Sequence, residues 1–211
     1  RAKRATMKTA HCQAVTTLSS FANPARKATT SYTTRKPAMS KPKSAPQPKL
    51  LKLRRFGDPV LREVARRLSV EEIKSGEIQV HITDMHYTNE VKKYGVGLAA
   101  PQVGSSVALA IIAIRPTELR PKVEPYEQVI INPEYEGIGR RRAVWEGCLS
   151  TGTGKHTLFG KALRYKTLRA TWHDEQGKKH TEVLGGLPAH VFQHETDHLH
   201  GVLFVDKVRD P

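Results

Sequence analysis

The stretch QHETDHLHG, Gln193–Gly201, places two histidines and a glutamate at a fixed spacing near the end of the chain. His194 and His198 are four residues apart, so on a helix they share one face and can reach one metal ion. Glu195 directly follows the first histidine and can lie beside a metal-bound water rather than on the metal. A polar helix face with two surface histidines is the alternative that this short motif leaves open. The stretch therefore predicts a metal-ligand helix in the C-terminal part of the chain.

The third protein ligand of such a site is expected upstream of this helix. Catalytic metal sites usually have three protein ligands and keep one position open for water. Metzincins extend the motif with a glycine and then a third histidine, and here Gly201 matches the glycine but Phe204 occupies the histidine position. The only acidic residues after the motif are Asp206 and Asp210. A downstream ligand is therefore not expected.

Cysteine is the candidate for the missing ligand. The chain contains only Cys12 and Cys148, which is too few for a disulfide framework. Cys148 lies in the segment EGCLS, residues 146–150. A lone cysteine is more often a small buried apolar residue than a ligand. A thiolate and two histidines, however, form a known three-ligand set that leaves the fourth position for water.

A third segment, GVGLAAPQVG (residues 95–104), begins like a nucleotide-binding loop. That fingerprint requires a strand before the glycines and a helix after them. Here residues 78–94 have helical spacing and residues 107–114 form a β-branched run, so the order is inverted. No phosphate-binding lysine follows the glycines either. We expect Gly95 and Gly97 to let the backbone approach a ligand closely, with the Gln102 amide directed into a site.

The ordered segments GVGLAAPQ, EGCLS and QHETDHLHG resemble the three signature motifs of the peptide deformylases. The resemblance covers roughly Leu51 to the C-terminus, including FGDP at residues 56–59 and GVLFVD after the predicted metal helix. It implies a divalent metal, usually Fe²⁺, with Zn²⁺, Ni²⁺ or Co²⁺ also able to occupy the site, and the ligand types do not choose among them. The residues implied for the site are Cys148, His194 and His198 as metal ligands, Glu195 as general base, and the Gln102 side chain and the Leu149 backbone N–H beside the oxyanion.

The resemblance also implies a reaction and a substrate. A divalent metal lowers the pKa of its bound water toward neutrality. Glu195 would accept that water's proton as hydroxide attacks the formyl carbon of an N-formylmethionyl nascent peptide. It would then protonate the leaving amine, releasing formate. An apolar pocket would hold the methionine side chain, and the residues implied for substrate binding are Val96, Gly97, Trp145, Glu146, Gly147, Leu187, His190 and Val191.

Two features depart from the family pattern. His190 stands where relatives more often carry an apolar or basic residue, so it either makes the pocket more polar or points to solvent. After EGCLS the family usually continues with an apolar residue and proline. Here Thr151 and Gly152 follow instead, and a longer stretch than usual precedes Arg164. The departure at residues 151–163 concerns the substrate entrance rather than the metal site.

The N-terminal part of the chain differs sharply in composition from the rest. Residues 1–50 contain eleven Lys or Arg, thirteen Ser or Thr and no Asp or Glu. They carry eleven of the fifteen net positive charges, which leaves +4 for residues 51–211. This composition predicts a transit peptide at residues 1–36, a Pro/Lys linker at 37–50, and a mitochondrial location, with a plastid-type organelle as the alternative.

A disordered basic arm that contacts ribosomal RNA is the other interpretation of this tail. The tail lacks the interleaved aromatic and arginine residues suited to base stacking, so we expect no specific nucleic-acid partner. The ribosome itself remains a candidate partner. The chain has no run of eighteen apolar residues, so no membrane-spanning helix is predicted.

Residues 51–211 are sufficient for one compact catalytic domain. The pattern predicts a helix over residues 78–94, strands over 107–114, 128–132, 166–172 and 179–184, and a final helix with Pro188 in its first turn. Strands clustered between two helices indicate an α+β fold with a mostly antiparallel sheet, and the family resemblance implies the same fold. A peptide could add as a strand to an exposed edge of such a sheet.

Two other function classes remain open. A metallopeptidase acting on internal peptide bonds would need a third ligand other than Cys148. A catalytically inactive descendant would serve as a binding module, and the altered sequence after Ser150 keeps that alternative open.

Overall fold

The computed structural model describes residues 47–92, 95–118, 120–152 and 156–208. The predicted transit peptide and all but the last residues of the predicted linker lie outside these ranges. Helix α2 spans Gly76–Lys92, and the first described residues contact it. The Lys49 N–H donates to Asp84 Oδ1 at 2.7 Å and the Leu51 N–H donates to Thr88 Oγ1 at 2.8 Å. The packed part of the chain therefore includes Lys49.

Short helical segments precede α2. The 3-10 helix η1 spans Pro59–Arg62 and α1 spans Val70–Ile73. Helix α2 starts two residues before the predicted helix, whose last two residues lie outside the described ranges. It buries Ile78, Ile82 and Met85, whose spacing agrees with the predicted helix.

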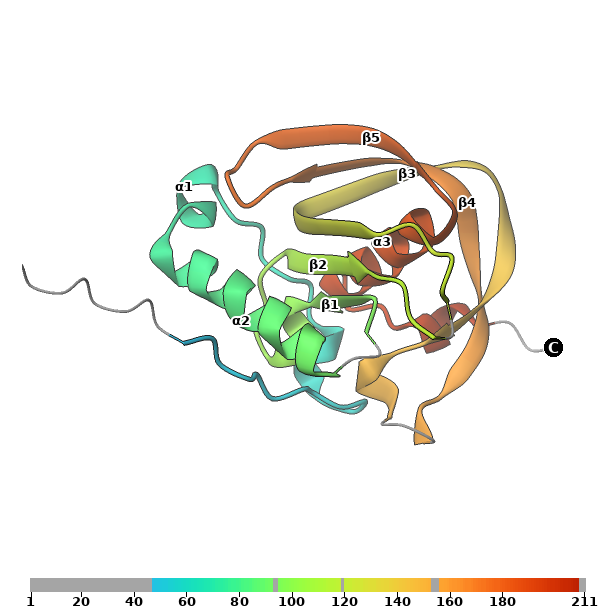
Figure 1. The fold of residues 1–211 in the computed structure, drawn as a ribbon, viewed down its shortest axis with the longest axis horizontal. Coiled ribbons are helices and arrows are strands. Elements are labelled where there is room, and N and C mark those ends of the chain that lie inside the picture. Colours follow the sequence, from blue (N-terminus) through green and yellow to red (C-terminus); the bar gives the residue numbers. More distant parts are fainter. Residues whose placement is uncertain (1–46, 93–94, 119, 153–155, 209–211) are drawn as a thin grey trace, which may run out of the picture. The chain divides into compact units, whose positions relative to one another are not determined.

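Five strands form one sheet in the order β1-β2-β3-β4-β5 (Figure 1). Every neighbouring pair is antiparallel, which confirms the predicted α+β class with its mostly antiparallel sheet. The strands are β1 (Gly97–Ala99), β2 (Leu109–Ile114), β3 (Tyr126–Gly147), β4 (Phe159–His173) and β5 (Lys179–Gly185).

Strand β3 is far longer than predicted. The sequence indicated only residues 128–132, but the strand continues to Gly147. The extension contains Pro133 and three glycines, which are unfavourable in strands. Pairing with β4 overrides these local preferences, and register shifts between Ile131 and Glu134 and between Ile138 and Arg141 accommodate them. Strand β4 likewise begins seven residues before its predicted start, at Phe159. The long ribbon carries Gly147 to the functional site.

Strand β2 lies between two helices. All six of its residues are buried. Ile112 belongs to a cluster with Phe192 of helix α3, which spans Gly186–Leu199, whereas Ile111 belongs to a second cluster with Met85 of α2. The two helices thus cover opposite faces of this part of the sheet (Figure 1). Coverage of both faces explains why β2 reads as a continuous apolar run rather than an alternating one.

Helix α3 is the predicted C-terminal helix, with Pro188 in its first turn. Two short 3-10 helices lie near it: η2 (Ala100–Val103) follows β1, and η3 (Leu149–Thr151) follows β3. A third, η5, spans Phe204–Lys207. This arrangement brings the ends of β1 and β3 beside α3. Among the described helices, none combines the length and apolar character needed to cross a bilayer.

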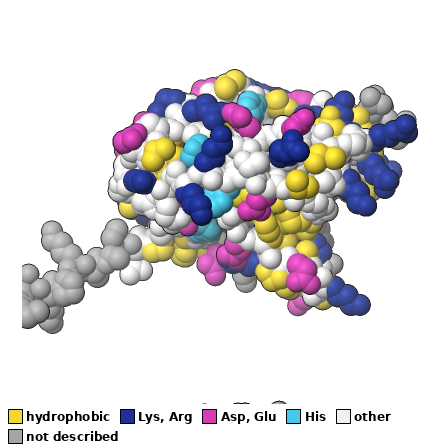
Figure 2. Space-filling model, turned by 90° about the horizontal axis from the view of Figure 1, so that it is seen from above, with side chains coloured by type: hydrophobic (Ala, Val, Ile, Leu, Met, Phe, Trp, Pro, Cys, Tyr) yellow, Lys and Arg dark blue, Asp and Glu magenta, His cyan; other side chains and the backbone are white. Residues whose placement is uncertain are grey.

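Surface charges of the described residues are mixed. Figure 2 shows one face of the molecule, where lysine and arginine side chains are interspersed with aspartate and glutamate. This mixture agrees with the small net charge of residues 51–211 and the concentration of basic residues before them.

Candidate metal centre

Three side chains from separate motifs converge beside α3. The ligand atoms of Cys148, His194 and His198 all lie within 4.8 Å of one another. Both histidines project from one face of α3, and Cys148 lies between β3 and η3. Cys148 and His198 are buried, with 5% and 1% of their surface exposed. A thiolate and two imidazoles at this separation fit a divalent transition metal that keeps a further position for water. The structure therefore brings the predicted trio together.

A buried carboxylate orients the first histidine. His194 Nδ1 lies 2.8 Å from Glu146 Oε2. Burial by itself would raise the pKa of Glu146, but hydrogen bonds from Arg164, His190 and His194 outweigh it and hold this pKa far below its usual value. Because an ionised carboxylate only accepts hydrogen bonds, His194 Nδ1 must carry the proton. Nε2 is then the nitrogen of His194 that would bind a metal, after releasing any proton of its own.

Arg164 of β4 joins Glu146 to a second carboxylate. Its Nε and Nη2 donate to the two oxygens of Glu146 at 2.5 and 2.9 Å, and its Nη1 donates to Asp197. Lys207 Nζ donates to the other oxygen of Asp197 at 2.7 Å. Burial would lower the pKa of Arg164, but Glu146 and Asp197 raise it above its usual value. The buried Arg164 and the partly exposed Lys207 therefore compensate the two buried carboxylates.

Arg164 and Asp197 were not predicted as parts of the site. A signal for Arg164 was present, because it shares the inward-facing phase of β4 with Ala162 and Leu168, which are both buried. An arginine at a core position requires a buried partner. No comparable signal pointed to Asp197, which reads as a polar position within the metal-ligand motif.

Glu146 and His190 were predicted to line the methionine pocket. The Glu146 carboxylate lies among hydrogen-bond partners, with only 2% of the side chain exposed. His190 Nε2 lies 2.8 Å from Glu146 Oε1, and 21% of its side chain is exposed. His190 therefore does not simply point to solvent. It and His194, one helical turn apart, bind opposite oxygens of the same carboxylate.

The Cys148 thiol is strongly acidic in this setting. Burial raises its pKa, but the charges and hydrogen bonds of His198 and His194 outweigh burial and hold the pKa well below its usual value. Sγ lies 3.2 Å from His198 Nε2 and 3.2 Å from Gln102 Nε2. The Gln102 Oε1 accepts from the Ala99 N–H at 2.8 Å, which turns its amide NH₂ toward the thiol. The predicted direction of Gln102 into the site is therefore what the structure has.

Glu195 is a buried carboxyl group, 2% exposed, in contact with the backbone of β1. Burial raises its pKa to about 7, against the opposing influence of His194 and His198. A Cβ added to Gly97 would lie only 2.3 Å from Glu195 Oε1, so a side chain at residue 97 would collide with the carboxyl group. This close approach explains the glycine. A carboxyl group that titrates near neutrality beside a metal trio suits general acid–base chemistry.

The remaining residues predicted for substrate binding occupy different surroundings. Val96 and Leu187 are partly buried and pack on the core cluster that contains Val191. Gly147 lies against the ring of Phe159. Trp145 is 66% exposed, with Lys161 Nζ 5.4 Å from its ring centroid. Trp145 and Glu146 are neighbours on β3, where successive side chains face opposite sides of the strand.

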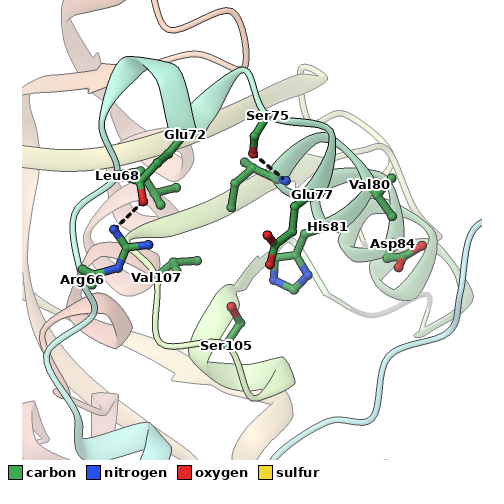
Figure 3. Close-up of a pocket in the computed structure, with 11 residues that line it drawn as sticks. Arg66, Leu68, Glu72, Ser75, Glu77, Val80, His81, Asp84, Ser105 and Val107 are labelled. Atoms are coloured by element: carbon green, nitrogen blue, oxygen red, sulfur yellow. Dashed lines mark hydrogen bonds and ion pairs between the residues drawn. The ribbon is translucent and has the colours of Figure 1, made fainter.

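A separate cavity of about 290 Å³ lies near α1 and α2 (Figure 3). Arg66 and Glu72 face each other across one side at 2.8 Å, and Glu77 and His81 lie close together on another (Figure 3). It contains no residue of the three motifs. Within the described residues, the Cys148 trio is the group that can hold a metal ion.

Comparisons with known proteins cover the same part of the chain. The family model for polypeptide deformylase matches residues 50–211. Peptide deformylase 1 of Bifidobacterium longum is 38% identical over 170 residues, which span 78% of this chain and 76% of the relative. A peptide deformylase of Leptospira biflexa is 36% identical over 161 residues, spanning 75% and 87% of the two chains.

Solved structures agree. The Met-Ala-Ser-bound class I type b peptide deformylase of Acinetobacter baumannii superposes with a TM-score of 0.70 at 32% identity, covering 77% of this chain and all of the other. The Synechococcus elongatus peptide deformylase in complex with actinonin gives 0.65 at 35% identity, covering 82% and 85%. The family match spans the residues that form the sheet, the trio and α3, and the chain belongs to the polypeptide deformylase family.

Proposed function

We propose that this chain is a metal-dependent amidohydrolase that removes the formyl group from N-formylmethionyl peptides and releases formate. The observation that carries the proposal is the buried Glu195 carboxyl group beside the Cys148–His194–His198 trio. Such a group can accept and return a proton within one reaction cycle at neutral pH. Membership of the polypeptide deformylase family supports the same activity.

The trio would hold one divalent metal ion. A metal bound there supplies Lewis acidity and makes a bound water more acidic. Fe²⁺ is our assignment, with Zn²⁺, Ni²⁺ or Co²⁺ as ions that the same donors also suit. Glu146 supports the assignment of His194 as a ligand, because it holds the proton on Nδ1 and so directs Nε2 toward the thiolate side.

The chain's own groups then perform the proton transfers. Glu195 removes a proton from the attacking water while the water oxygen forms a bond to the formyl carbon. The formyl C–N bond then breaks while Glu195 returns the proton to the leaving amine, so that formate and a free N-terminal methionine result. The Gln102 amide and the Leu149 N–H would donate to the carbonyl oxygen as it becomes negative. Loss of one such donor typically slows a reaction about a hundredfold or more.

Substrate binding combines a pocket with a sheet edge. Val96, Leu187 and Val191 are apolar and belong to the core beside α3, which suits a methionine side chain. Strand β1 pairs on one side with β2 and forms one edge of the described sheet. An extended peptide can add to such an edge through main-chain hydrogen bonds.

The test is formate release from formyl-Met-Ala-Ser by the full chain, purified anaerobically and reconstituted with Fe²⁺. We expect Glu195→Ala to abolish turnover while retaining the metal, and Cys148→Ala to lose both. Normal activity in Glu195→Ala would refute the mechanism. Cleavage of an internal peptide bond, with metal retained in Cys148→Ala, would favour the metallopeptidase. Bound metal without any formate would favour an inactive binding module.

We also propose that residues 1–36 are a transit peptide that directs the catalytic domain to the mitochondrion, with a plastid-type organelle as the alternative. Eleven basic and no acidic residues among the first 50 support this. A fluorescent fusion of the full chain should enter the organelle, whereas a fusion lacking residues 1–50 should stay cytosolic. Organelle entry without these residues would overturn the proposal. Salt-sensitive cosedimentation with ribosomes would instead support the basic-arm interpretation.

A further inference from the structure

The segment before η1 connects the two backbone segments that carry the proposed oxyanion donors, the Gln102 amide and the Leu149 N–H. Residues 49–56, called the N-terminal strap here, first run along α2 through the bonds of Lys49 and Leu51. The Arg54 N–H then donates to the carbonyl oxygen of Gln102 at 2.7 Å, and the Phe56 N–H donates to that of Ser150 at 2.8 Å. The strap is thus bonded to the backbone on both sides of the site.

Arg55 of the strap holds the turn after β3. Its Nη1 donates to the carbonyl oxygens of Leu149 at 3.0 Å and Gly152 at 2.9 Å. These two residues are more than ninety positions away in the sequence. One guanidinium group therefore bridges the start and the end of the turn that follows the Cys148 ligand.

The carbonyl groups of this turn have the following partners. Cys148 O accepts from the Thr151 N–H at 3.0 Å and from Thr151 Oγ1 at 2.9 Å. Leu149 O and Gly152 O accept from Arg55, and Ser150 O accepts from the strap backbone. Cys148 C=O and Leu149 N–H belong to one planar trans peptide group, so fixing the carbonyl fixes the direction of the N–H. Thr151 therefore fixes the direction of the proposed oxyanion donor directly. The strap acts on it through Thr151, because it holds the carbonyl groups of Leu149, Ser150 and Gly152 around that residue.

The local sequence gives this turn little stiffness of its own. Gly152 follows Thr151 in the chain, and glycine has the greatest backbone freedom of any residue. A Cβ added to Gly152 would lie 2.1 Å from the carbonyl oxygen of His156, so the backbone passes itself closely there and excludes a stiffer residue. The guanidinium bonds of Arg55 supply a constraint that the turn's own residues do not.

We propose that Arg55 is a positioning residue for deformylation. By holding the carbonyl oxygens of Leu149 and Gly152, on either side of Thr151, it keeps Thr151 bonded to the Cys148 C=O and so orients the Leu149 N–H. The inference rests on the proposed function, because it assigns Arg55 a role in that reaction. The hydrogen bonds of Arg55 go to backbone carbonyl groups of the turn and not to the side chains of the trio. Its effect passes through the peptide groups of residues 148–152, so its loss should slow turnover without weakening substrate binding.

The kinetic test compares Arg55→Ala with the wild-type full chain, both loaded with Fe²⁺. We expect kcat to fall about tenfold to a hundredfold, which is at most the effect of removing a whole oxyanion donor. KM should stay within about twofold of the wild-type value. Guanidinium ion at millimolar concentration should restore part of kcat. Arg55→Lys should restore little, because an ammonium group lacks the planar fork that spans two acceptors. Arg67→Ala is the matched control, since Arg67 is an exposed arginine that pairs with Glu134 on the surface.

A second measurement does not depend on catalysis. Hydrogen exchange of the backbone amides of residues 148–152 should accelerate in Arg55→Ala and remain unchanged in Arg67→Ala. If the wild-type chain releases no formate, the proposed function fails. The exchange measurement still tests whether Arg55 holds the turn of residues 148–152. Unchanged exchange in Arg55→Ala, or a wild-type kcat, would overturn the inference. A loss expressed only in KM would overturn it as well.

Discussion

The metal centre has two halves, and different interactions hold each half in place. Helix α3 supplies His194, Glu195 and His198 from five consecutive positions, and buried charges hold it in place. The turn of residues 148–152 supplies the thiol and the Leu149 N–H, and it is held by an exposed arginine and by backbone bonds from the strap. A helix provides its own geometry through its period. A turn obtains its geometry from distant partners.

The largest expected effect comes from removing the charge that anchors the helix half. Arg164→Ala would leave Glu146 and Asp197 without their shared cation in the interior, which should destabilise the protein by about 3–5 kcal/mol. Denaturant unfolding of the metal-free chain measures this. Arg169→Ala is the control on the same strand, because Arg169 is 57% exposed and pairs with Glu136, and an exposed pair contributes about 1 kcal/mol or less. Equal losses in the two variants would show that the buried network is not what anchors α3.

Replacement of Glu195 should have the opposite effect, because it should stabilise the folded chain, and the size of this effect should depend on pH. The pKa of Glu195 rises from 4.5 to about 7 on burial, so ionisation in the folded state is unfavourable. Below about pH 4.5 both states are protonated and the group has no effect on stability. Between pH 4.5 and 7 Glu195 ionises in the unfolded state but stays protonated in the folded state, so the folded state becomes less stable. Above pH 7 the full loss of stability is present, on the order of 3 kcal/mol.

Glu195→Gln should therefore stabilise the metal-free chain at pH 8 and leave its stability unchanged at pH 4. Thermal unfolding of the two chains in the presence of a chelator measures the difference at each pH. A stabilisation that is constant across this range would show that ionisation of Glu195 is not its source.

The smallest expected effect concerns the strap that supports the turn half. A chain that begins at Lys52 loses the backbone donors that pair with Asp84 and Thr88, which are 7% and 0% exposed. Leaving these acceptors unpaired should cost about 1–3 kcal/mol relative to a chain that begins at Lys49. Chemical denaturation of the two truncated chains measures this difference. If they unfold at the same denaturant concentration, residues 49–51 contribute nothing to stability.

The fold was predictable where local patterns and final structure agree. The apolar spacing of α2 and the buried run of β2 both followed from neighbouring residues. The long arm of β3 did not, because its proline and glycines contradict a strand and only the ladder with β4 stabilises it. Register shifts of this kind have no signature in one strand considered alone.

The candidate site divides in the same way. The spacing of His194, Glu195 and His198, the thiol in EGCLS and the amide after the glycine segment were sufficient to predict the ligands and the family, because residue type and helical period are local properties. The tertiary structure decided the rest: the proton on His194 through Glu146, the closeness of Glu195 to Gly97, and the hold of Arg55 on the turn. Each of these joins residues distant in the chain. Which distant groups meet is set by strand register and by the need to pair every buried charge, and a linear pattern records neither.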